Sequence, residues 1–227
     1  QALTTDQLLS ISTKQLTGAF STNMIAALTA DQVLTLTSEQ LGALTVTQVA
    51  AFETDDFALL TSEQLPGLTS KQLASITDDQ LLAMSADQFS YLDTKQLHGL
   101  SASQISVMET DDLAAITDTY FATLSSSQLA GLTTTQLSSL STDQFAAMTT
   151  SQLAGAFTTA MIQAISTAQF AAMSYQISGL TATQIAAIET ADLVSFSTDA
   201  LVLLTTAQIA ALTTDQVVAL TADQVSS

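Results

Sequence analysis

The sequence predicts an all-α fold, a solenoid of about 28 very short helices, from three observations. An eight-residue pattern runs through all 227 residues, as in LTTAQIAALTTDQVVAL at 204–220. With its positions named a to h from the leading Leu, positions a and f are apolar in all 28 units. Position b is mostly Ser or Thr, and position e is Gln in 21 units. Repeats of this kind decide the fold before any other feature does.

The period of eight excludes one long helix and a strand. Eight residues of α-helix leave roughly 80° of rotation per unit, so positions a and f would spiral around the helix without forming a stripe. In a strand, positions five residues apart point to opposite faces. A chain of short helices, interrupted once per unit, is the arrangement that remains.

Each unit contains a complete helix start. Ser or Thr at b followed three residues later by Gln is a capping box, in which each side chain bonds the other residue's backbone amide. The apolar residues at a and f then form the hydrophobic staple around that cap. Because isolated helices of about seven residues are unstable in water, the units must stack on a shared core.

The repeat is continuous enough to predict one domain over residues 1–227. Its phase shifts at three units only: those at Ile11 and Met148 have nine residues, and the one at Met173 has seven. Both ends of the chain stop inside the pattern, whereas solenoids usually carry polar end caps. We therefore expect a segment of a longer array, or a filament subunit that associates end to end.

Phenylalanine and glycine recur in pairs. A Phe at f is followed by Gly at h in the next unit in five cases. We expect the glycines to make room for the rings, since interiors are close-packed. The alternative is a glycine that simply ends each helix. The pairs are Phe57 and Gly67, Phe89 and Gly99, Phe121 and Gly131, Phe145 and Gly155, and Phe170 and Gly179.

The composition excludes several classes of partner. The chain has 21 acids, three lysines and no arginine, for a net charge of −18, so it lacks the cations that nucleic acid binding requires. No apolar run approaches the roughly 20 residues of a membrane helix. Many acids lie at position d, in the first helical turn, where the helix dipole favours negative charge. Cysteine is absent, which excludes disulfides and thiolate chemistry.

No motif for catalysis is present, and we expect no enzyme activity, no catalytic or cofactor-binding residues and no cofactor. His98 is the only histidine, so a metal site built from several histidines of one chain is excluded. We expect His98 to lie at the surface. The Ser and Thr residues are assigned to caps by their period. A flat hydroxyl face for ice or glycan is the weaker alternative.

Three units depart from the pattern in the same way. FETDDF, METDDL and IETADL carry Glu at b and Asp at e: Glu53 with Asp56, Glu109 with Asp112, and Glu189 with Asp192. The simpler interpretation moves the cap by one residue onto the following Thr. The alternative is a calcium site with carboxylate ligands, such as Glu53, Asp55 and Asp56 or Glu109, Asp111 and Asp112. Ala191 removes the middle acid from the third copy.

The in-phase pattern LTTAQIAALTTDQVVALTADQ (204–224) resembles the short LTxxQ-type helical repeats of large secreted bacterial surface proteins. The resemblance spans the chain and marks a repeat type. It implies an extracellular or cell-surface location in a bacterium and a scaffold-like or adhesive role. We therefore expect a structural protein, such as an adhesin stalk, surface layer or filament subunit. The alternative is an extended binding module for a peptide, glycan or calcium.

Overall fold

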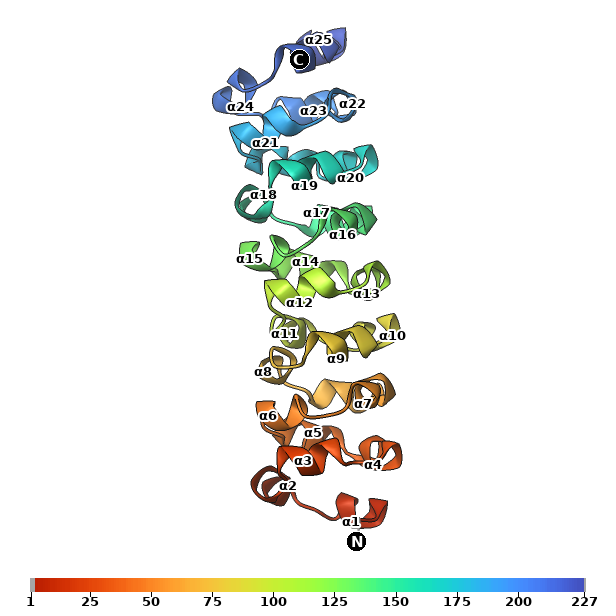
Figure 1. Ribbon diagram of the computed structural model, residues 1–227. Coiled ribbons are helices and arrows are strands. Elements are labelled where there is room, and N and C mark those ends of the chain that lie inside the picture. Colours follow the sequence, from red (N-terminus) through yellow and green to blue (C-terminus); the bar gives the residue numbers. More distant parts are fainter. Residues whose placement is uncertain (1–2, 227) are drawn as a thin grey trace. The chain divides into compact units, whose positions relative to one another are not determined.

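The computed structural model describes residues 3–226 and confirms the all-α prediction. Within that range it contains 26 α-helices, two 3₁₀ helices and no strand. The chain divides into two compact units, residues 1–116 (unit 1) and 117–227 (unit 2), and each is considered by itself (Figure 1). The expectation of a single domain over residues 1–227 stays a prediction.

The α-helices are four to seven residues long, so the longest reach the predicted length of about seven, and the 3₁₀ helices η1 and η2 have three and six residues. Those of unit 1 are α1 (Thr5–Leu9), α2 (Thr13–Ala19), α3 (Thr22–Ala26), α4 (Ala30–Thr35), α5 (Ser38–Ala43), α6 (Val46–Val49), α7 (Thr54–Leu59), η1 (Leu65–Gly67), α8 (Ser70–Leu73), α9 (Asp78–Ala83), α10 (Ala86–Ser90), α11 (Thr94–Leu97), α12 (Ala102–Val107) and α13 (Thr110–Ala115). Those of unit 2 are α14 (Asp118–Thr123), α15 (Ser126–Leu129), α16 (Thr134–Ser139), α17 (Thr142–Ala147), α18 (Thr150–Ala156), α19 (Thr159–Ala164), α20 (Thr167–Ala172), η2 (Ser174–Gly179), α21 (Ala182–Ala187), α22 (Thr190–Leu193), α23 (Thr198–Leu201), α24 (Thr206–Ala210), α25 (Thr214–Ala219) and α26 (Ala222–Ser226).

The predicted capping boxes begin most of these helices. At α9 the Gln80 backbone N–H donates to Thr77 Oγ1 at 3.1 Å, and the Thr77 N–H donates to Gln80 Oε1 at 2.9 Å. In many octads the residue at position a ends the preceding helix with extended backbone, as Met84 does between α9 and α10, where the N-cap Ser85 is also extended. Two consecutive extended residues, a and b, turn the chain away from the helix axis, and the cap then starts the next helix. The octad is therefore one helix and one corner.

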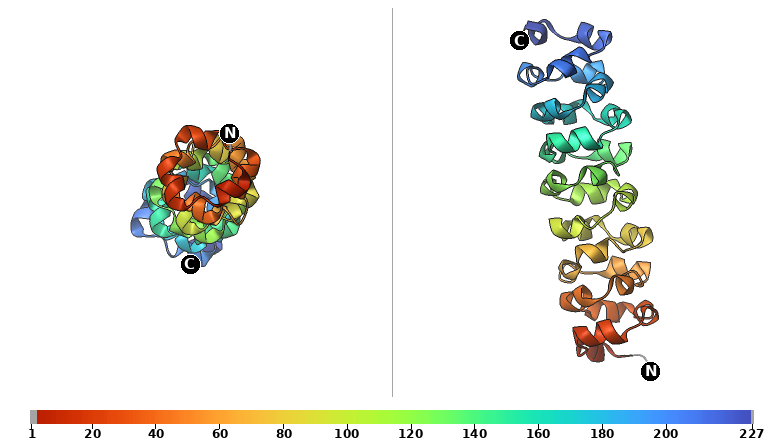
Figure 2. Two further views of the ribbon diagram at one scale, coloured as in Figure 1. Left: turned by 90° about the horizontal axis from the view of Figure 1, so that it is seen from below. Right: turned by 90° about the vertical axis from the view of Figure 1, so that its left-hand side faces the viewer.

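Stacking of helices three apart in the chain builds the core. In unit 1, α4 packs on α1, α5 on α2 and α13 on α10; in unit 2, α17 packs on α14 and α24 on α21. Positions a and f supply the interior, with Leu73 fully buried and Ile76 4% exposed. Seen along the stacking direction, the first helices of unit 1 surround a common axis (Figure 2). Each helix alone would melt, so this shared core holds the fold together.

Two octads, those that begin at Leu60 and Met173, form a 3₁₀ helix in place of an α-helix, each for a local reason. Pro66 has no backbone N–H to continue an α-helix, and its unit forms the 3₁₀ helix η1 instead. The seven-residue unit at Met173 lacks one residue of the pattern and forms η2. In both places the position f residue, Leu65 or Ile177, is still fully buried. The core therefore tolerates a change of helix type.

The glycine prediction was wrong about the neighbour. An added Cβ at Gly67 or Gly99 would fall on the backbone carbonyl of Ser38 or Ser70, 29 residues earlier, and not on a Phe ring. No described glycine has positive φ, so the helix-end alternative in its left-handed form does not apply either. Phenylalanine rings pack against other phenylalanine rings instead, as Phe145 and Phe157 do with centroids 6.3 Å apart. At Gly67 and Gly99 the absence of a side chain lets successive turns of backbone approach closely.

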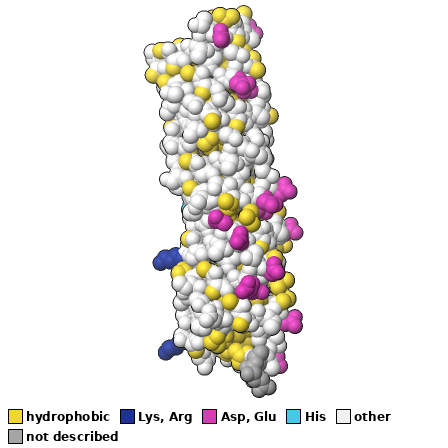
Figure 3. All heavy atoms as spheres, in the orientation of Figure 1, with side chains coloured by type: hydrophobic (Ala, Val, Ile, Leu, Met, Phe, Trp, Pro, Cys, Tyr) yellow, Lys and Arg dark blue, Asp and Glu magenta, His cyan; other side chains and the backbone are white. Residues whose placement is uncertain are grey.

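Charge is unevenly shared between the units. All three lysines and 14 of the 21 acids belong to unit 1. On the face of unit 1 seen in Figure 3, the acidic side chains gather toward one edge and lysines project from the opposite edge. Among residues 3–226, no helix combines the length and apolar character needed to cross a membrane.

Candidate functional site

The most regular polar feature of the chain is the glutamine at position e. Its oxygen closes the capping box of its own helix, and its amide nitrogen reaches the preceding turn. Gln104 Nε2 donates to the backbone carbonyl oxygens of Leu73 at 3.0 Å and Ile76 at 3.2 Å. These partners lie 31 and 28 residues earlier, so one turn of the solenoid takes between three and four octads. We call such a residue an inter-turn glutamine.

The same pair of bonds recurs in both units, with Nε2 to oxygen distances of 2.6–3.3 Å. In unit 1 it is made by Gln40, Gln48, Gln64, Gln72, Gln80, Gln88, Gln96 and Gln104. In unit 2 it is made by Gln152, Gln169, Gln184, Gln208, Gln216 and Gln224.

Sequence reasoning assigned these glutamines a capping role and missed the inter-turn role. A signal for it was present. A capping box accepts Glu as readily as Gln, and a negative charge suits the first helical turn. Position e nevertheless contains no Glu in any unit. Only an amide can accept from the cap and donate elsewhere at once, so the absence of Glu indicates a required donor.

The three octads with Glu at b and Asp at e begin their helices at the same position of the repeat as the neighbouring octads do. Helices α7, α13 and α22 begin at Thr54, Thr110 and Thr190, each after a Glu at the N-cap. The predicted one-residue shift of the cap onto Thr was therefore wrong. In α7 the reason is that Asp56 Oδ2 accepts the Glu53 backbone N–H at 3.2 Å, as the glutamine oxygen does elsewhere. Glu109 and Asp112 form the same bond at 3.2 Å.

The three aspartates are buried, unlike most acids of the chain. Asp56, Asp112 and Asp192 are 6%, 4% and 6% exposed. Burial raises the pKa of Asp56, and it raises the pKa of Asp112 to about 6, with smaller contributions from Glu109 and Asp111. The bond from the N-cap amide opposes the rise in both cases.

The predicted calcium ligands are not brought together. Within residues 3–226, no three acidic or histidine side chains form a group that could hold a metal ion. Asp56 and Asp112 accept hydrogen bonds from their N-cap residues and are buried, whereas Glu53, Asp55, Glu109 and Asp111 are exposed. Calcium binding by Glu53, Asp55 and Asp56 therefore lacks a preformed site.

The remaining polar candidates are dispersed. His98 is exposed, as predicted, at the end of α11. Tyr91 and Tyr175 are exposed and lie in different units, while Tyr120 is buried and its pKa is raised by that burial. Most hydroxyls at position b accept a backbone N–H at a cap, such as Thr69 from Gln72 at 3.3 Å. Such hydroxyls belong to the helix starts.

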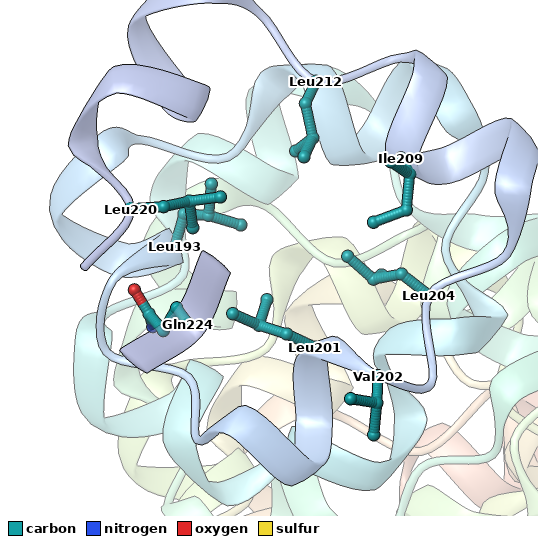
Figure 4. Close-up of a pocket in the computed structure, with 8 residues that line it drawn as sticks. All are labelled: Leu193, Leu201, Val202, Leu204, Ile209, Leu212, Leu220 and Gln224. Atoms are coloured by element: carbon teal, nitrogen blue, oxygen red, sulfur yellow. The ribbon is translucent and has the colours of Figure 1, made fainter. Parts of the chain in front are cut away.

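Unit 2 contains an open apolar cavity of about 330 Å³ beside α24, α25 and α26. Its lining is Leu193, Leu201, Val202, Leu204, Ile209, Leu212, Leu220 and Gln224. Figure 4 shows Leu201, Leu204 and Leu212 pointing into it. These residues continue the a and f rows of the core. The cavity is thus lined mainly by side chains of the same kind as those that fill the core.

Comparison with known proteins identifies the repeat. No curated protein matches the chain significantly. The sequence pattern of a family described as the ALTTAQ repeat matches residues 49–86, 105–141, 121–155 and 185–222, together more than half of the chain. These stretches include capping boxes and inter-turn glutamines of both units. The short helical repeat type predicted from the sequence is confirmed, and the chain belongs to the ALTTAQ repeat family.

Proposed function

We propose that this chain is a structural protein, a repeat segment of a bacterial cell-surface or extracellular assembly such as an adhesin stalk, surface layer or filament. The observation that carries the proposal is the series of inter-turn glutamines. Each joins two turns through a buried amide, and the same contact recurs in both units. A protein whose polar interior serves only to connect one turn to the next is suited to adding length.

The outer surface supports the same role. Positions c, d and g carry mainly Thr, Ser, Ala and Asp, small side chains without a concentration of aromatic or basic groups. Binding surfaces usually contain aromatic and arginine anchors, and the chain has no arginine or tryptophan. A surface of small polar groups and a net charge of −18 favours solubility over recognition. We place the protein outside the cell on its composition and on its resemblance to secreted repeats.

Stacking against a further turn of the same repeat is the second part of the proposal. The cavity beside α24–α26 is lined by core leucines, and in unit 1 Gln7 and Gln15 are exposed. Apolar side chains and amide donors together make most turn-to-turn contacts within the units. Another turn of octad repeats, from the same kind of chain, satisfies both.

Electron microscopy of the purified chain over a range of concentrations tests the proposal. We expect particles that lengthen with concentration. Leu204→Glu, inside the cavity, should abolish the growth, while Val218→Glu is the control because Val218 is 79% exposed and does not line the cavity. Particles of constant size, or equal growth of both variants, would contradict stacking. Antibody labelling of intact source cells tests the location, and labelling only after lysis would contradict it.

A further inference from the structure

The buried aspartates at position e interrupt the series of inter-turn glutamines. Asp112 holds the place in α13 that Gln104 holds in α12, where by register a glutamine amide would face the carbonyls of Leu81 and Met84 in the preceding turn. An aspartate is one methylene shorter than glutamine and, when ionised, has no hydrogen to donate. At the α10–α13 contact, the amide donor is thus replaced by a buried carboxyl group.

The third copy shows how such a carboxylate is satisfied. Asp192 Oδ1 accepts a hydrogen bond from Thr167 Oγ1 at 2.6 Å. Thr167 is the first residue of α20, the helix of the preceding turn on which α22 packs. The equivalent first residues of α4 and α10, which face α7 and α13, are Ala30 and Ala86. Those two positions have no hydroxyl, so Asp56 and Asp112 lack the donor that Asp192 has.

The charges around Asp112 in unit 1 also disfavour its ionised form. Glu109 and Asp111, on the same helix start, raise its pKa in addition to burial. The titratable residue of α10, the helix packed against α13 in unit 1, is Asp87, which is exposed and is not among the charges that raise this pKa. Only the Glu109 backbone N–H favours the carboxylate. Geometry and charge therefore both favour a proton on this group.

We propose that the contact made by Asp112 between successive turns of unit 1 depends on the protonation of its carboxyl group, and that the contact made by Asp56 does so in the same way. With a proton, the carboxyl group is neutral and supplies a donor in the place of the glutamine amide, so the turn closes on the one before it. Without the proton, a buried negative charge without a side-chain donor weakens the same contact. Acidification therefore stabilises these contacts in unit 1, and neutral pH destabilises them. The inference concerns stability within unit 1 and does not depend on the proposed function.

The direction of the effect follows from linkage. A folded-state pKa of about 6 for Asp112 lies above the ordinary value of 3.8. The folded state then binds the proton more tightly than the unfolded state, so stability is greatest below pH 4 and falls as pH rises to 6. Two pKa units correspond to about a hundredfold change in the unfolding equilibrium. We expect local opening of α13 to increase between tenfold and about a hundredfold from pH 4 to pH 7.

The experiment combines a carboxyl ¹³C NMR titration with amide hydrogen exchange of α10 and α13 in the whole chain. Asp112→Asn keeps the shape and the cap acceptor but always carries a donor. It should remove most of the pH dependence of exchange in α13 and slow exchange at pH 7. The matched control is Asp87→Asn, which deletes one charge from an exposed position of α10 and should keep the wild-type pH dependence.

A second variant tests the geometry from the opposite side. Ala86→Thr places a hydroxyl where Thr167 meets Asp192, and the pKa of Asp112 should fall toward its ordinary value. Titration of Asp112 near pH 4 in the wild type would overturn the proposal. So would equal pH dependence in Asp112→Asn and Asp87→Asn, because the effect would then come from the general loss of negative charge.

Discussion

Gln104 Nε2 lies 3.0 Å from the carbonyl oxygen of Leu73, a residue 31 positions earlier in the chain. Its own Oε1 lies 2.9 Å from the Ser101 backbone nitrogen, three positions earlier. One planar amide thus joins a short-range contact, the helix cap, to a long-range contact between successive turns. Residues about 28–31 positions apart become neighbours because most octads carry this glutamine.

Removal of the Gln104 side chain should separate these two roles. Gln104→Ala loses the cap acceptor and both inter-turn bonds, whereas Gln15→Ala loses only the acceptor that binds the Ser12 N–H at 3.0 Å. Since two buried carbonyls lose partners, Gln104→Ala should cost about 1–3 kcal/mol more than Gln15→Ala. Urea unfolding followed by circular dichroism measures the difference. Equal losses would mean that the inter-turn bonds contribute nothing net.

Gly99 should not tolerate even a methyl group. A Cβ at Gly99 would overlap the Ser70 carbonyl, so Gly99→Ala should destabilise unit 1 by about 1–3 kcal/mol. Gly18→Ala is the matched control, because no atom lies within 4 Å of its added Cβ. There, the better helix propensity of Ala should stabilise by about 0.5–1 kcal/mol. Thermal melts of both variants show the signs, and a neutral Gly99→Ala would refute the close approach.

Loss of a capping hydroxyl should cost a moderate, predictable amount. Thr69 accepts the Gln72 backbone N–H at the start of α8, and Thr69→Ala should destabilise by about 1 kcal/mol. Thr54→Ala changes an exposed first helical residue in the same unit and should stay within about 0.5 kcal/mol of wild type. Chemical unfolding of the two variants gives the comparison. If they unfold alike, the hydroxyl period reflects something other than capping.

The hydroxyl of Thr167 should stabilise the folded state more than the hydroxyl of an ordinary first helical residue does. Thr167→Val removes the 2.6 Å hydrogen bond to buried Asp192 and should destabilise unit 2 at pH 7 by about 1.5–3 kcal/mol, as expected for a bond to a charged group. Thr206→Val, at the exposed first residue of α24, is the control. Hydrogen exchange of α22 reports the local effect. Protection of α22 unchanged in Thr167→Val would show that Asp192 does not need this donor.

Local structure could be predicted from the sequence because it depends on residues three to five apart. Thr77 and Gln80 indicate a helix start by their types and spacing alone, and the recurrence of that pair in phase predicts short helices and a shared core. The buried a and f rows follow from the same period. The regular period even contained evidence for the inter-turn bond, in the absence of Glu from position e, although only the donor requirement explains that absence.

Tertiary structure decided which distant residues meet. The number of octads in a turn depends on the angle between successive helices, and that angle results from packing between turns, which no single unit encodes. It places the Ser70 backbone against Gly99, so glycine is needed there to leave room for backbone atoms and not for an aromatic ring. It also places Thr167 beside Asp192 but Ala86 in the equivalent place for Asp112, so three similar ETxD segments acquire different electrostatic environments. A period specifies what repeats along the chain, and the turn-to-turn contact specifies what each repeat touches.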